Sequence, residues 1–274
     1  ISSAEKYEKI LKDNFVLVNQ QERLESIGSQ IKQICEGNVE VNQQLISSLV
    51  FLSEWPVVFA GGFGKECLDL PKEVIQESLA KHQKIFSVSA KDGALLAQFA
   101  GVVNSGKDNI GRIRQNYEKI LSARLRDARF FYREDTKTKL FDKIEQLKEI
   151  VFLGSLGTVF DRQDRLVSMA MYAGKMLELS DQQQRFLCRV ASLCKADLVT
   201  HMVGEFPTLQ GTIGKYYAEY DKEPQEVALA VEEHYKPRFA ADTGPATKIG
   251  SLLAILDKMD IIVGCFALGF LPTG

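Results

Sequence analysis

The sequence is poor in the residues that hold small domains together through disulfides or metal ions. Its five cysteines are odd in number, scattered and never spaced as CxxC: Cys35, Cys67, Cys188, Cys194 and Cys265. This pattern argues against a disulfide framework or a zinc site and suits a reducing compartment. No apolar run reaches the ~18 residues of a transmembrane helix, and no segment resembles a signal peptide. We therefore expect buried free thiols, no membrane segment and a cytoplasmic location.

The sequence also lacks an excess of charge of either sign. Lys and Arg number 34 against 36 for Asp and Glu, so the net charge is −2. No general basic field would attract nucleic acid, and a polyanionic partner would have to be met by a local patch. Hydrophobic residues make up 45% of the 274 residues, enough to bury the core of one large domain or two ordinary ones. Because the chain starts without Met and stops at GFLPTG, we expect it to be part of a longer protein.

Motifs for nucleophilic catalysis and for nucleotide binding are missing as well. The chain has no GxSxG, and no cysteine lies near a histidine in a recognisable pattern. The glycines of AGGFGKE, from Ala60 to Glu66, do not lead into the Lys-Ser or Lys-Thr that ends a P-loop. We therefore predict no catalytic residue in this chain.

The periodicity of the first half predicts a mainly α fold with a small α+β unit. Residues 4–35 have the apolar spacing of one or two amphipathic helices. After a further helical segment, the chain breaks at Pro56 and enters a β-branched and aromatic run. Another helix follows, with Asp69 placed to cap it and Pro71 near its first turn. Two apolar runs then flank Asp92-Gly93, which predicts a β-hairpin.

From Asn109 onward the pattern is helical. Apolar residues between Ile113 and Phe131 trace one face of a long helix that reaches the neighbourhood of Arg133. Glycines and prolines divide the remainder into shorter helices. The expected organisation is an N-terminal helical segment (1–40), a small α+β domain ending in the long helix (41–138) and an all-helical domain (139–274).

The long helix carries cations at seven-residue spacing: Arg112, Lys119, Arg126 and Arg133. Seven residues are nearly two turns, so these side chains form a stripe that drifts slowly around the helix. Such a stripe could bind the phosphate backbone of an RNA with salt-sensitive, sequence-independent affinity. The alternative is an ordinary solvated helix face, whose cations pair with neighbouring carboxylates.

A run of polar residues in the helical domain suggests a metal site. Asp197, His201 and Glu205 are four residues apart, which on one helix would place them on roughly one face. With the distal His234 and Asp260 they invite comparison with the HD hydrolases, all-helical enzymes in which histidines, an adjacent His-Asp pair and a distant Asp hold metal. Since the chain has only three histidines and no His-Asp pair, too few ligands are available for an open metal site. We predict an HD-like scaffold whose pocket keeps only remnants of the ligand set and binds no metal.

The stretch EEHYKPRFAADTGP, which begins at Glu232, ends a helix and continues into a loop rich in Pro and Gly. Rigid scaffolds often present binding residues on such loops, so Arg238 is a candidate RNA contact. His234 has a simpler interpretation as a residue that interacts with the last carbonyl groups of the helix.

Longer blocks of the sequence resemble the central part of the beta subunit of bacterial-type glycyl-tRNA synthetase. The similarity follows the family's order and covers most of residues 48–274. It rests on SLVFLSEWPVVFAGGF, DLPKEVIQESLAKHQKIFSV, SARLRDARFFYREDTK, FLGSLGTVFDRQDRL, KADLVTHMVGEFPTLQGTIGKYYA, EEHYKPRFAADTGP and LAILDKMDIIVGCFALGFLPTG.

The resemblance implies a subunit of a ligase that joins glycine to its tRNA with ATP and Mg. In the family the chemistry belongs to the alpha subunit, or to an alpha region fused to the beta region, whereas the beta part binds tRNA and contains an HD-like helical domain. The implied partners are tRNA(Gly) and the alpha part, within an oligomeric whole enzyme, and this chain alone would hold no cofactor. Since it lacks the family's C-terminal anticodon-binding region, the expected RNA contacts are weak.

Some positions depart from the usual family pattern. Ile85 and Ser87 stand where an aromatic residue and a proline are common, and His201 stands where an acidic or amide residue is usual. FAADTGP replaces a loop that contains Gly-Asp, so no role is assigned to Ala241 and Asp242. Two alternatives remain at this point: an HD-type metal-dependent phosphohydrolase, and a structural module of the synthetase without RNA contact.

Overall fold

A computed structural model describes residues 4–35, 37–40, 42–104 and 109–270. The chain divides into two compact units, Ile1–Arg129 and Phe130–Gly274, called unit 1 and unit 2 below. The division expected from the sequence, with boundaries after residues 40 and 138, stays a prediction, and Val41 lies outside the described residues. The fold is mainly helical with one small sheet, as the periodicity predicts.

Unit 1 contains a four-stranded antiparallel sheet. Its strands are β1 (Asn38–Val39), β2 (Pro56–Gly62), β3 (Phe86–Ser89) and β4 (Leu95–Asn104), in the order β1-β3-β4-β2. The predicted hairpin is confirmed: β3 and β4 pair, and the turn between them places Gly93 at φ +86°, a conformation that glycine adopts without strain. The predicted break at Pro56 is the first residue of β2, which is an edge strand and tolerates proline.

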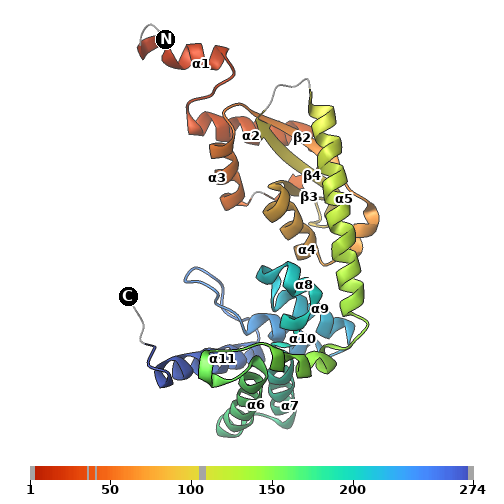
Figure 1. The fold of residues 1–274 in the computed structure, drawn as a ribbon, viewed down its shortest axis with the longest axis vertical. Coiled ribbons are helices and arrows are strands. Elements are labelled where there is room, and N and C mark those ends of the chain that lie inside the picture. Colours follow the sequence, from red (N-terminus) through yellow and green to blue (C-terminus); the bar gives the residue numbers. More distant parts are fainter. Residues whose placement is uncertain (1–3, 36, 41, 105–108, 271–274) are drawn as a thin grey trace. The chain divides into compact units, whose positions relative to one another are not determined.

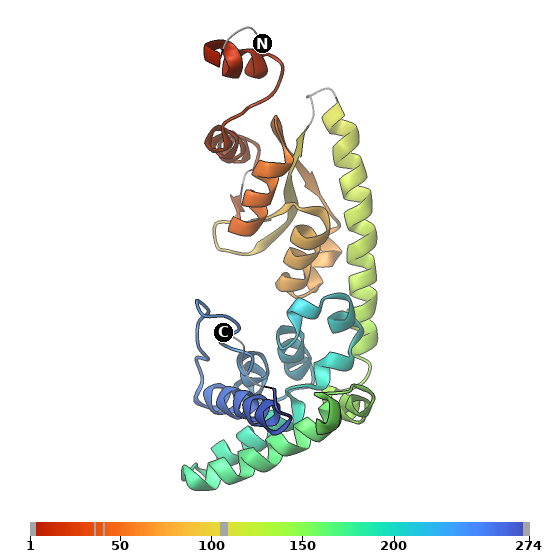
Figure 2. The same cartoon turned by 60° about the vertical axis from the view of Figure 1, so that its left-hand side comes forward.

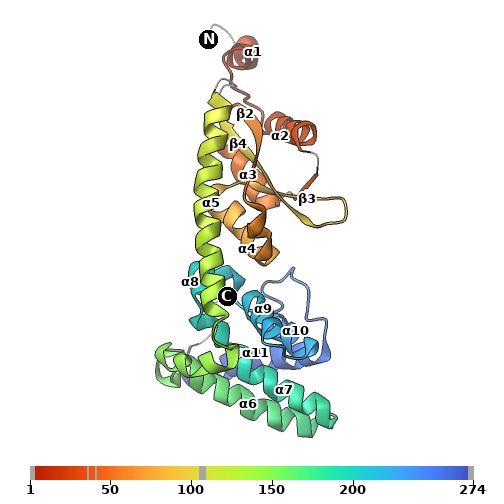
Figure 3. The same ribbon diagram turned by 90° about the vertical axis from the view of Figure 1, so that its right-hand side faces the viewer.

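The helices of unit 1 cover both faces of this sheet. Val58 packs with Ile27 of α2 and Leu49 of α3, whereas its neighbour Phe59 contacts Tyr117 of α5 on the opposite face. Figure 3 shows α5 along one side of the sheet and α2 on the other. The helices are α1 (Tyr7–Asp13), α2 (Gln20–Ile34), α3 (Gln43–Leu52), α4 (Lys72–Glu77) and α5 (Ile110–Asp135), with short turns at η1 (Ala4–Lys6), η2 (Lys65–Asp69) and η3 (Ser78–His82).

The predicted cap of α4 is wrong. Pro71 is the residue at the N-cap, and no side chain caps this helix. Asp69 instead ends η2, where its carboxylate accepts a hydrogen bond from Nη2 of Arg129 at 3.2 Å. The carboxylate therefore contacts α5 instead of closing the first turn of α4.

The long helix α5 matches its prediction closely. It runs unbroken from Ile110 to Asp135, drawn from yellow to green in Figure 2. Its apolar face buries Leu121, Leu125 and Ala128, which are spaced so that they return to the same side of the helix. The division between the units falls within this helix, after Arg129.

Unit 2 is helical: residues 160–270, all described, contain no strand. An isolated bridge joins Val151 and Thr158. Helix α6 starts with a capping box of Thr158 and Asp161, and α6 and α7 lie side by side with α11 packed on both (Figure 1). The elements are η5 (Leu140–Glu149), η6 (Gly154–Leu156), α6 (Val159–Met176), α7 (Asp181–Leu193), η7 (Ala196–Val199), α8 (His201–Glu205), η8 (Pro207–Leu209), α9 (Thr212–Tyr220), α10 (Gln225–Glu233) and α11 (Lys248–Ala267). None of the described helices is long and apolar enough to cross a membrane.

Candidate functional site

The four cations at seven-residue spacing form one exposed face of α5, which we call the cationic face: Arg112, Lys119, Arg126 and Arg133. Arg112 and Lys119 lie on the side of the helix away from the buried Leu121. A seven-residue step drifts by about 20°, so Arg126 and Arg133 continue the same exposed stripe with a gradual turn around the helix. Among the described residues, none of the four charged groups has a hydrogen-bond or ion-pair partner. The solvated-face interpretation expected such pairs, and the described residues do not provide them.

Several other charged residues of α5 have partners. Arg129 bonds to Asp69, Arg114 lies 4.0 Å from Glu118, and Glu134 accepts from Lys137. Between Ile110 and Asp135 the helix has seven basic and four acidic residues, a net charge of +3, whereas the whole chain carries −2. The basic surplus of this helix is therefore concentrated in side chains that are free to meet an anion.

Arg238 is placed differently from the cationic face. It lies in the loop that joins α10 and α11, drawn in blue in Figure 2. Its guanidinium donates to the carbonyl oxygens of Thr208 at 3.2 Å and Gln210 at 3.0 Å, and its backbone N–H donates to Asp242. The guanidinium thus anchors the loop to the end of η8, and its role as an RNA contact stays a prediction.

Asp197, His201 and Glu205 do not share a helix face. The 3₁₀ helix η7 stops at Val199, and Thr200 in extended conformation caps the new helix α8 by accepting from the N–H of Val203. The four-residue spacing therefore spans two elements. Asp197 is buried, whereas His201 and Glu205 are exposed, so the side chains point in different directions.

The ring of His201 is held by Asp135, a residue that the sequence did not bring to attention. Oδ1 of Asp135 lies 2.8 Å from Nδ1 of His201 and also accepts from the backbone N–H of His201. Oδ2 of Asp135 accepts from the backbone N–H of Met202 and from the hydroxyl of Tyr217. The buried carboxylate thus caps the start of α8. The imidazole stacks on Phe131 at an interplanar angle of 6°, and its side chain is 63% exposed.

Asp197 is a buried structural acceptor. Its Oδ2 accepts from the backbone N–H groups of Gly211 at 2.5 Å and Gly214 at 3.2 Å. Burial raises the pKa of Asp197 to about 6, although these hydrogen bonds act in the opposite direction. Two features of position 211 require glycine. Its φ is +82°, a conformation that other residues rarely adopt, and a Cβ would lie 2.5 Å from the ring of Tyr235.

The other two residues of the predicted pocket belong to a separate network that is buried except for the partly exposed Arg165. We call it the ionic cluster: Arg162, Arg165, Lys195, His234, Asp257 and Asp260. Asp260 accepts from Nε of Arg165 at 2.7 Å and from its Nη2 at 3.2 Å, a two-point contact. Nη2 of Arg162 donates to Asp257 at 2.8 Å, and its Nε lies 3.4 Å from Asp260. The cluster joins α6, η7, α10 and α11.

Lys195 and His234 occupy the interior of this cluster. Nζ of Lys195, a residue only 2% exposed, lies 2.8 Å from Nε2 of His234 and 3.1 Å from Oδ1 of Asp257. Nδ1 of His234 lies 2.6 Å from the carbonyl oxygen of Val231. Burial and the nearby charge of Lys195 lower the pKa of His234 well below its ordinary value. The predicted role of His234 as a residue contacting the last carbonyls of its helix is confirmed by the bond to Val231.

These positions do not fit an HD-type metal site. The predicted ligands are divided between Asp197, the exposed His201 and Glu205, and the ionic cluster with His234 and Asp260. Within the described residues, no three His, Cys, Asp or Glu side chains converge in a way that could hold a metal ion. Three protein ligands are the minimum for a catalytic zinc site, so the geometry gives no support to the phosphohydrolase alternative.

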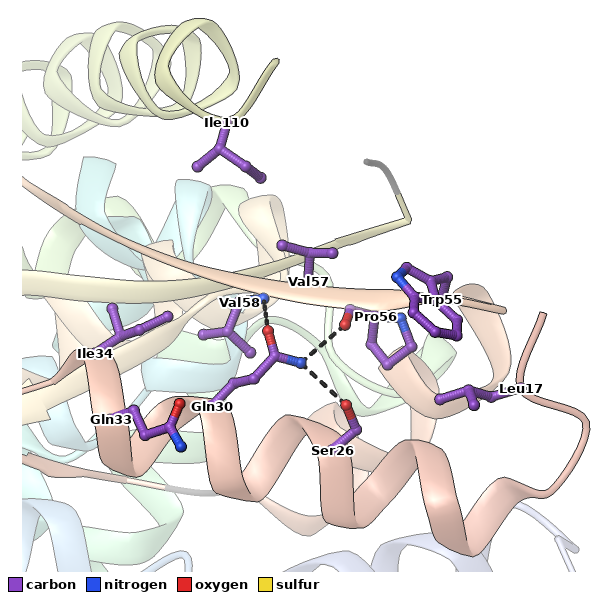
Figure 4. Close-up of a pocket in the computed structure, with 10 residues that line it drawn as sticks. All are labelled: Leu17, Ser26, Gln30, Gln33, Ile34, Trp55, Pro56, Val57, Val58 and Ile110. Carbon is purple, nitrogen blue, oxygen red and sulfur yellow. Dashed lines mark hydrogen bonds between the residues drawn. The ribbon is translucent and has the colours of Figure 1, made fainter. Parts of the chain in front are cut away.

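Unit 1 has a cavity of about 540 Å³ between α2 and the edge strand β2 (Figure 4). The amide of Gln30 donates to Pro56 O and Ser26 Oγ and accepts from Val58 N–H, so it serves as a hydrogen-bond partner for the strand edge. The lining residues, none of them charged, are Leu17, Ser26, Gln30, Gln33, Ile34, Trp55, Pro56, Val57, Val58 and Ile110. This cavity therefore offers no counter-ion for a phosphate or for the carboxylate of an amino acid.

Sequence reasoning missed Lys195, Asp257 and Asp135. A lysine among the apolar residues of VASLCKADL was a signal that its ammonium is buried, since lysines are almost never fully buried unless paired. Asp257 begins the DKMD segment, three residues before the predicted Asp260. No local pattern marks Asp135, because its partners lie 66 to 82 residues away.

Known proteins resemble this chain over its whole length. A family model described as "Glycyl-tRNA synthetase beta subunit" matches residues 1–274. The chain belongs to this family. Curated relatives named glycine–tRNA ligase beta subunit include those of Moorella thermoacetica, at 41% identity, and Clostridioides difficile strain 630, at 42%. Both alignments extend over 277 residues and cover 100% of this chain.

The chain spans about 40% of the length of these relatives of the beta-subunit family. The corresponding protein of Streptococcus agalactiae serotype Ia is 38% identical and is covered over 41% of its length. The resemblance seen in the sequence blocks is thereby confirmed. The cationic face of α5 and the ionic cluster of unit 2 are features of a beta-subunit region.

Proposed function

We propose that this chain is the part of a glycine–tRNA ligase beta subunit that holds tRNA(Gly) through the cationic face of α5. Membership of the beta-subunit family provides the context, and the single observation that carries the proposal is the set of exposed cations without partners among the described residues. Unit 2 serves as an HD-like helical scaffold without hydrolase chemistry. The setting is the cytoplasm, where tRNA is charged.

The spacing of the cationic face suits a polyphosphate chain. Successive cations lie about 10 Å apart along a straight helix, since each residue adds about 1.5 Å. Each long side chain can then reach a different phosphate, which gives affinity without sequence preference. Discrimination among tRNAs would come from other parts of the enzyme.

Aminoacylation belongs, in this proposal, to the alpha subunit or a fused alpha region, which uses ATP and Mg within an oligomeric enzyme. The cavity of unit 1 has no charged lining residue, and the geometry of unit 2 brings no three metal-ligating side chains together among the described residues. We therefore expect residues 1–274 alone to show no glycine-dependent ATP–pyrophosphate exchange. Clear exchange by this chain would contradict the assignment.

The binding proposal is tested with the complete synthetase by replacing Lys119 and Arg126 together with Ala. If these side chains contact phosphates, the variant should bind tRNA(Gly) more weakly. The slope of log affinity against log salt concentration should also decrease by about one unit for each phosphate contact removed. A matched control replaces two exposed lysines elsewhere in unit 1, Lys72 and Lys91, and removes the same charge.

The control separates a specific face from a general loss of positive charge. The Lys119 and Arg126 variant should lose affinity and slope while the Lys72 and Lys91 variant keeps both. Equal behaviour of the two variants, with both folded, would return the cationic face to the role of a solvated helix surface.

A further inference from the structure

Three groups surround the ammonium of Lys195 inside unit 2. Nε2 of His234 lies at 2.8 Å, and the carboxylate of Asp257 lies at 3.1 and 3.2 Å through its two oxygens. The ring of Tyr235 lies beneath the same nitrogen, with its centroid at 4.1 Å. An ammonium has three N–H donors, so an imidazole, a carboxylate and an aromatic face together satisfy it.

The tautomer of His234 leaves Nε2 able to accept a hydrogen bond from a cationic donor. The carbonyl oxygen of Val231 can only accept, so the 2.6 Å contact requires the proton on Nδ1 of His234. In the neutral ring this leaves the lone pair of Nε2 pointing at Lys195. Metal-binding histidines are oriented in the same way, through a hydrogen bond from the second ring nitrogen to a carbonyl or carboxylate group.

The surroundings suit an ammonium better than a divalent ion. Among the described residues, the nitrogen and oxygen neighbours of the Lys195 ammonium come from His234 and Asp257, and its third neighbour is a ring face, which is a poor ligand for a hard metal ion. Asp257 also accepts from Arg162, so part of its charge is already neutralised.

We propose that His234 and Asp257 form an internal cation site in unit 2 and that the ammonium of Lys195 is its permanent occupant in place of a metal ion. Lys195 directly follows the C-cap of α7, His234 is the C-cap of α10, and Asp257 belongs to α11. The covalently attached cation therefore ties three helices together without depending on the supply of a metal. The inference is independent of the RNA-binding role of α5.

The test exchanges the ammonium for a third ligand. In Lys195→His, the new imidazole joins His234 and Asp257, a ligand set that suits Zn²⁺. After incubation with Zn²⁺ and desalting, elemental analysis should find close to one equivalent of zinc per chain in this variant. The unchanged protein and Lys175→His, which adds a histidine on the exposed side of α6, should retain no stoichiometric zinc.

Two further measurements cover the case in which Lys195→His folds poorly. Zinc should then restore its thermal transition, because a ligand that binds the folded state stabilises it. In the unchanged protein, nitrogen NMR should show His234 neutral at pH 7 with the proton on Nδ1, and a chelator should leave the melting temperature unchanged. A metal ion retained by the unchanged protein, a proton on Nε2 of His234, or no zinc binding and no rescue in Lys195→His would each overturn the proposal.

Discussion

The exposed cations of α5 and the buried cations of the ionic cluster in unit 2 differ in whether their charge has a partner. Lys119 and Arg126 are exposed and have no partner among the described residues, so nothing in the described structure depends on their charge. Lys195 and Arg162 are buried, and carboxylates of α11 accompany both. An exposed cation remains free for an external anion, whereas a buried one is committed to internal partners because an unpaired buried charge is very costly.

This comparison explains why the predicted sites have different outcomes. Three residues of the metal-ligand pattern, Asp197, His234 and Asp260, lie in the interior, where other protein groups already satisfy them. Arg165, for example, donates two hydrogen bonds to Asp260. The residues that resemble a helix surface are the ones left free. The type of polar residue alone therefore gives little indication of binding. What distinguishes α5 from the interior of unit 2 is whether a polar side chain is buried and whether it already has a partner.

The largest expected effect comes from removing the shared carboxylate of the ionic cluster. Asp257→Ala leaves Lys195 and Arg162 without their common acceptor, and breaking a buried ion pair from one side costs about 3–5 kcal/mol. Urea denaturation of the variant measures this loss. Asp164→Ala, an exposed carboxylate on α6, is the matched control and should change stability by less than about 0.5 kcal/mol. A loss below about 1 kcal/mol for Asp257→Ala would mean that the cluster does not hold the helices together.

A pH-dependent effect is expected at Asp197, whose pKa of about 6 in the folded state exceeds the ordinary value of 3.8. Between these pH values the folded state binds more protons than the unfolded state, so the contribution of Asp197 to stability falls as pH rises. At pH 7 its ionisation costs on the order of 3 kcal/mol. Asp197→Asn removes this titration, and its stability relative to the unchanged protein should increase by that order between pH 4 and pH 7.

Asp197→Asn must be compared with the unchanged protein at each pH, because the titration of His234 changes stability in the opposite direction. Its pKa is lowered in the folded state, so stability from this group is lost as pH falls below the ordinary value of 6.5. This term is present in both proteins and cancels in the difference. A difference in unfolding free energy that does not change with pH would show that Asp197 is not buried as an acid of raised pKa.

A smaller effect is expected where α5 meets α8. Asp135→Asn keeps the size of the side chain but replaces one oxygen by an NH₂ group that cannot accept, so one or more of the donors from His201, Met202 and Tyr217 loses its acceptor. The expected cost is about 1–3 kcal/mol, measured by thermal or urea unfolding. Asp127→Asn on the exposed side of the same helix is the control and should be close to neutral. Equal stability of both variants would remove Asp135 as the anchor of α8.

The smallest change in stability is expected on the cationic face. Arg126→Ala should alter the free energy of unfolding by less than about 1 kcal/mol, since its charge has no partner among the described residues. The same variant of the complete synthetase should nevertheless bind tRNA(Gly) more weakly at low salt. A large loss of stability would show that Arg126 is engaged internally, and the contrast with Lys195 would then fail.

Much of the fold could be predicted because it rests on local patterns. Apolar spacing at every third or fourth residue placed α5, and Asp92-Gly93 between two apolar runs placed the β3–β4 hairpin. The cap at Asp69 was predicted wrongly because Arg129, which is distant in the sequence, binds that carboxylate. Local rules fail where a tertiary partner competes for the same polar group.

The sequence by itself determined the helical and strand periodicities, the cations at seven-residue spacing on α5 and the membership of the beta-subunit family. Only the tertiary structure decided that Lys195 meets His234, 39 residues away, and Asp257, 62 residues away. It also decided that Thr200 divides the spacing of Asp197 and His201 between two elements. The physical reason is that periodicity reports which side of an element is buried, whereas the pairing of buried charges depends on which elements the packed core brings together.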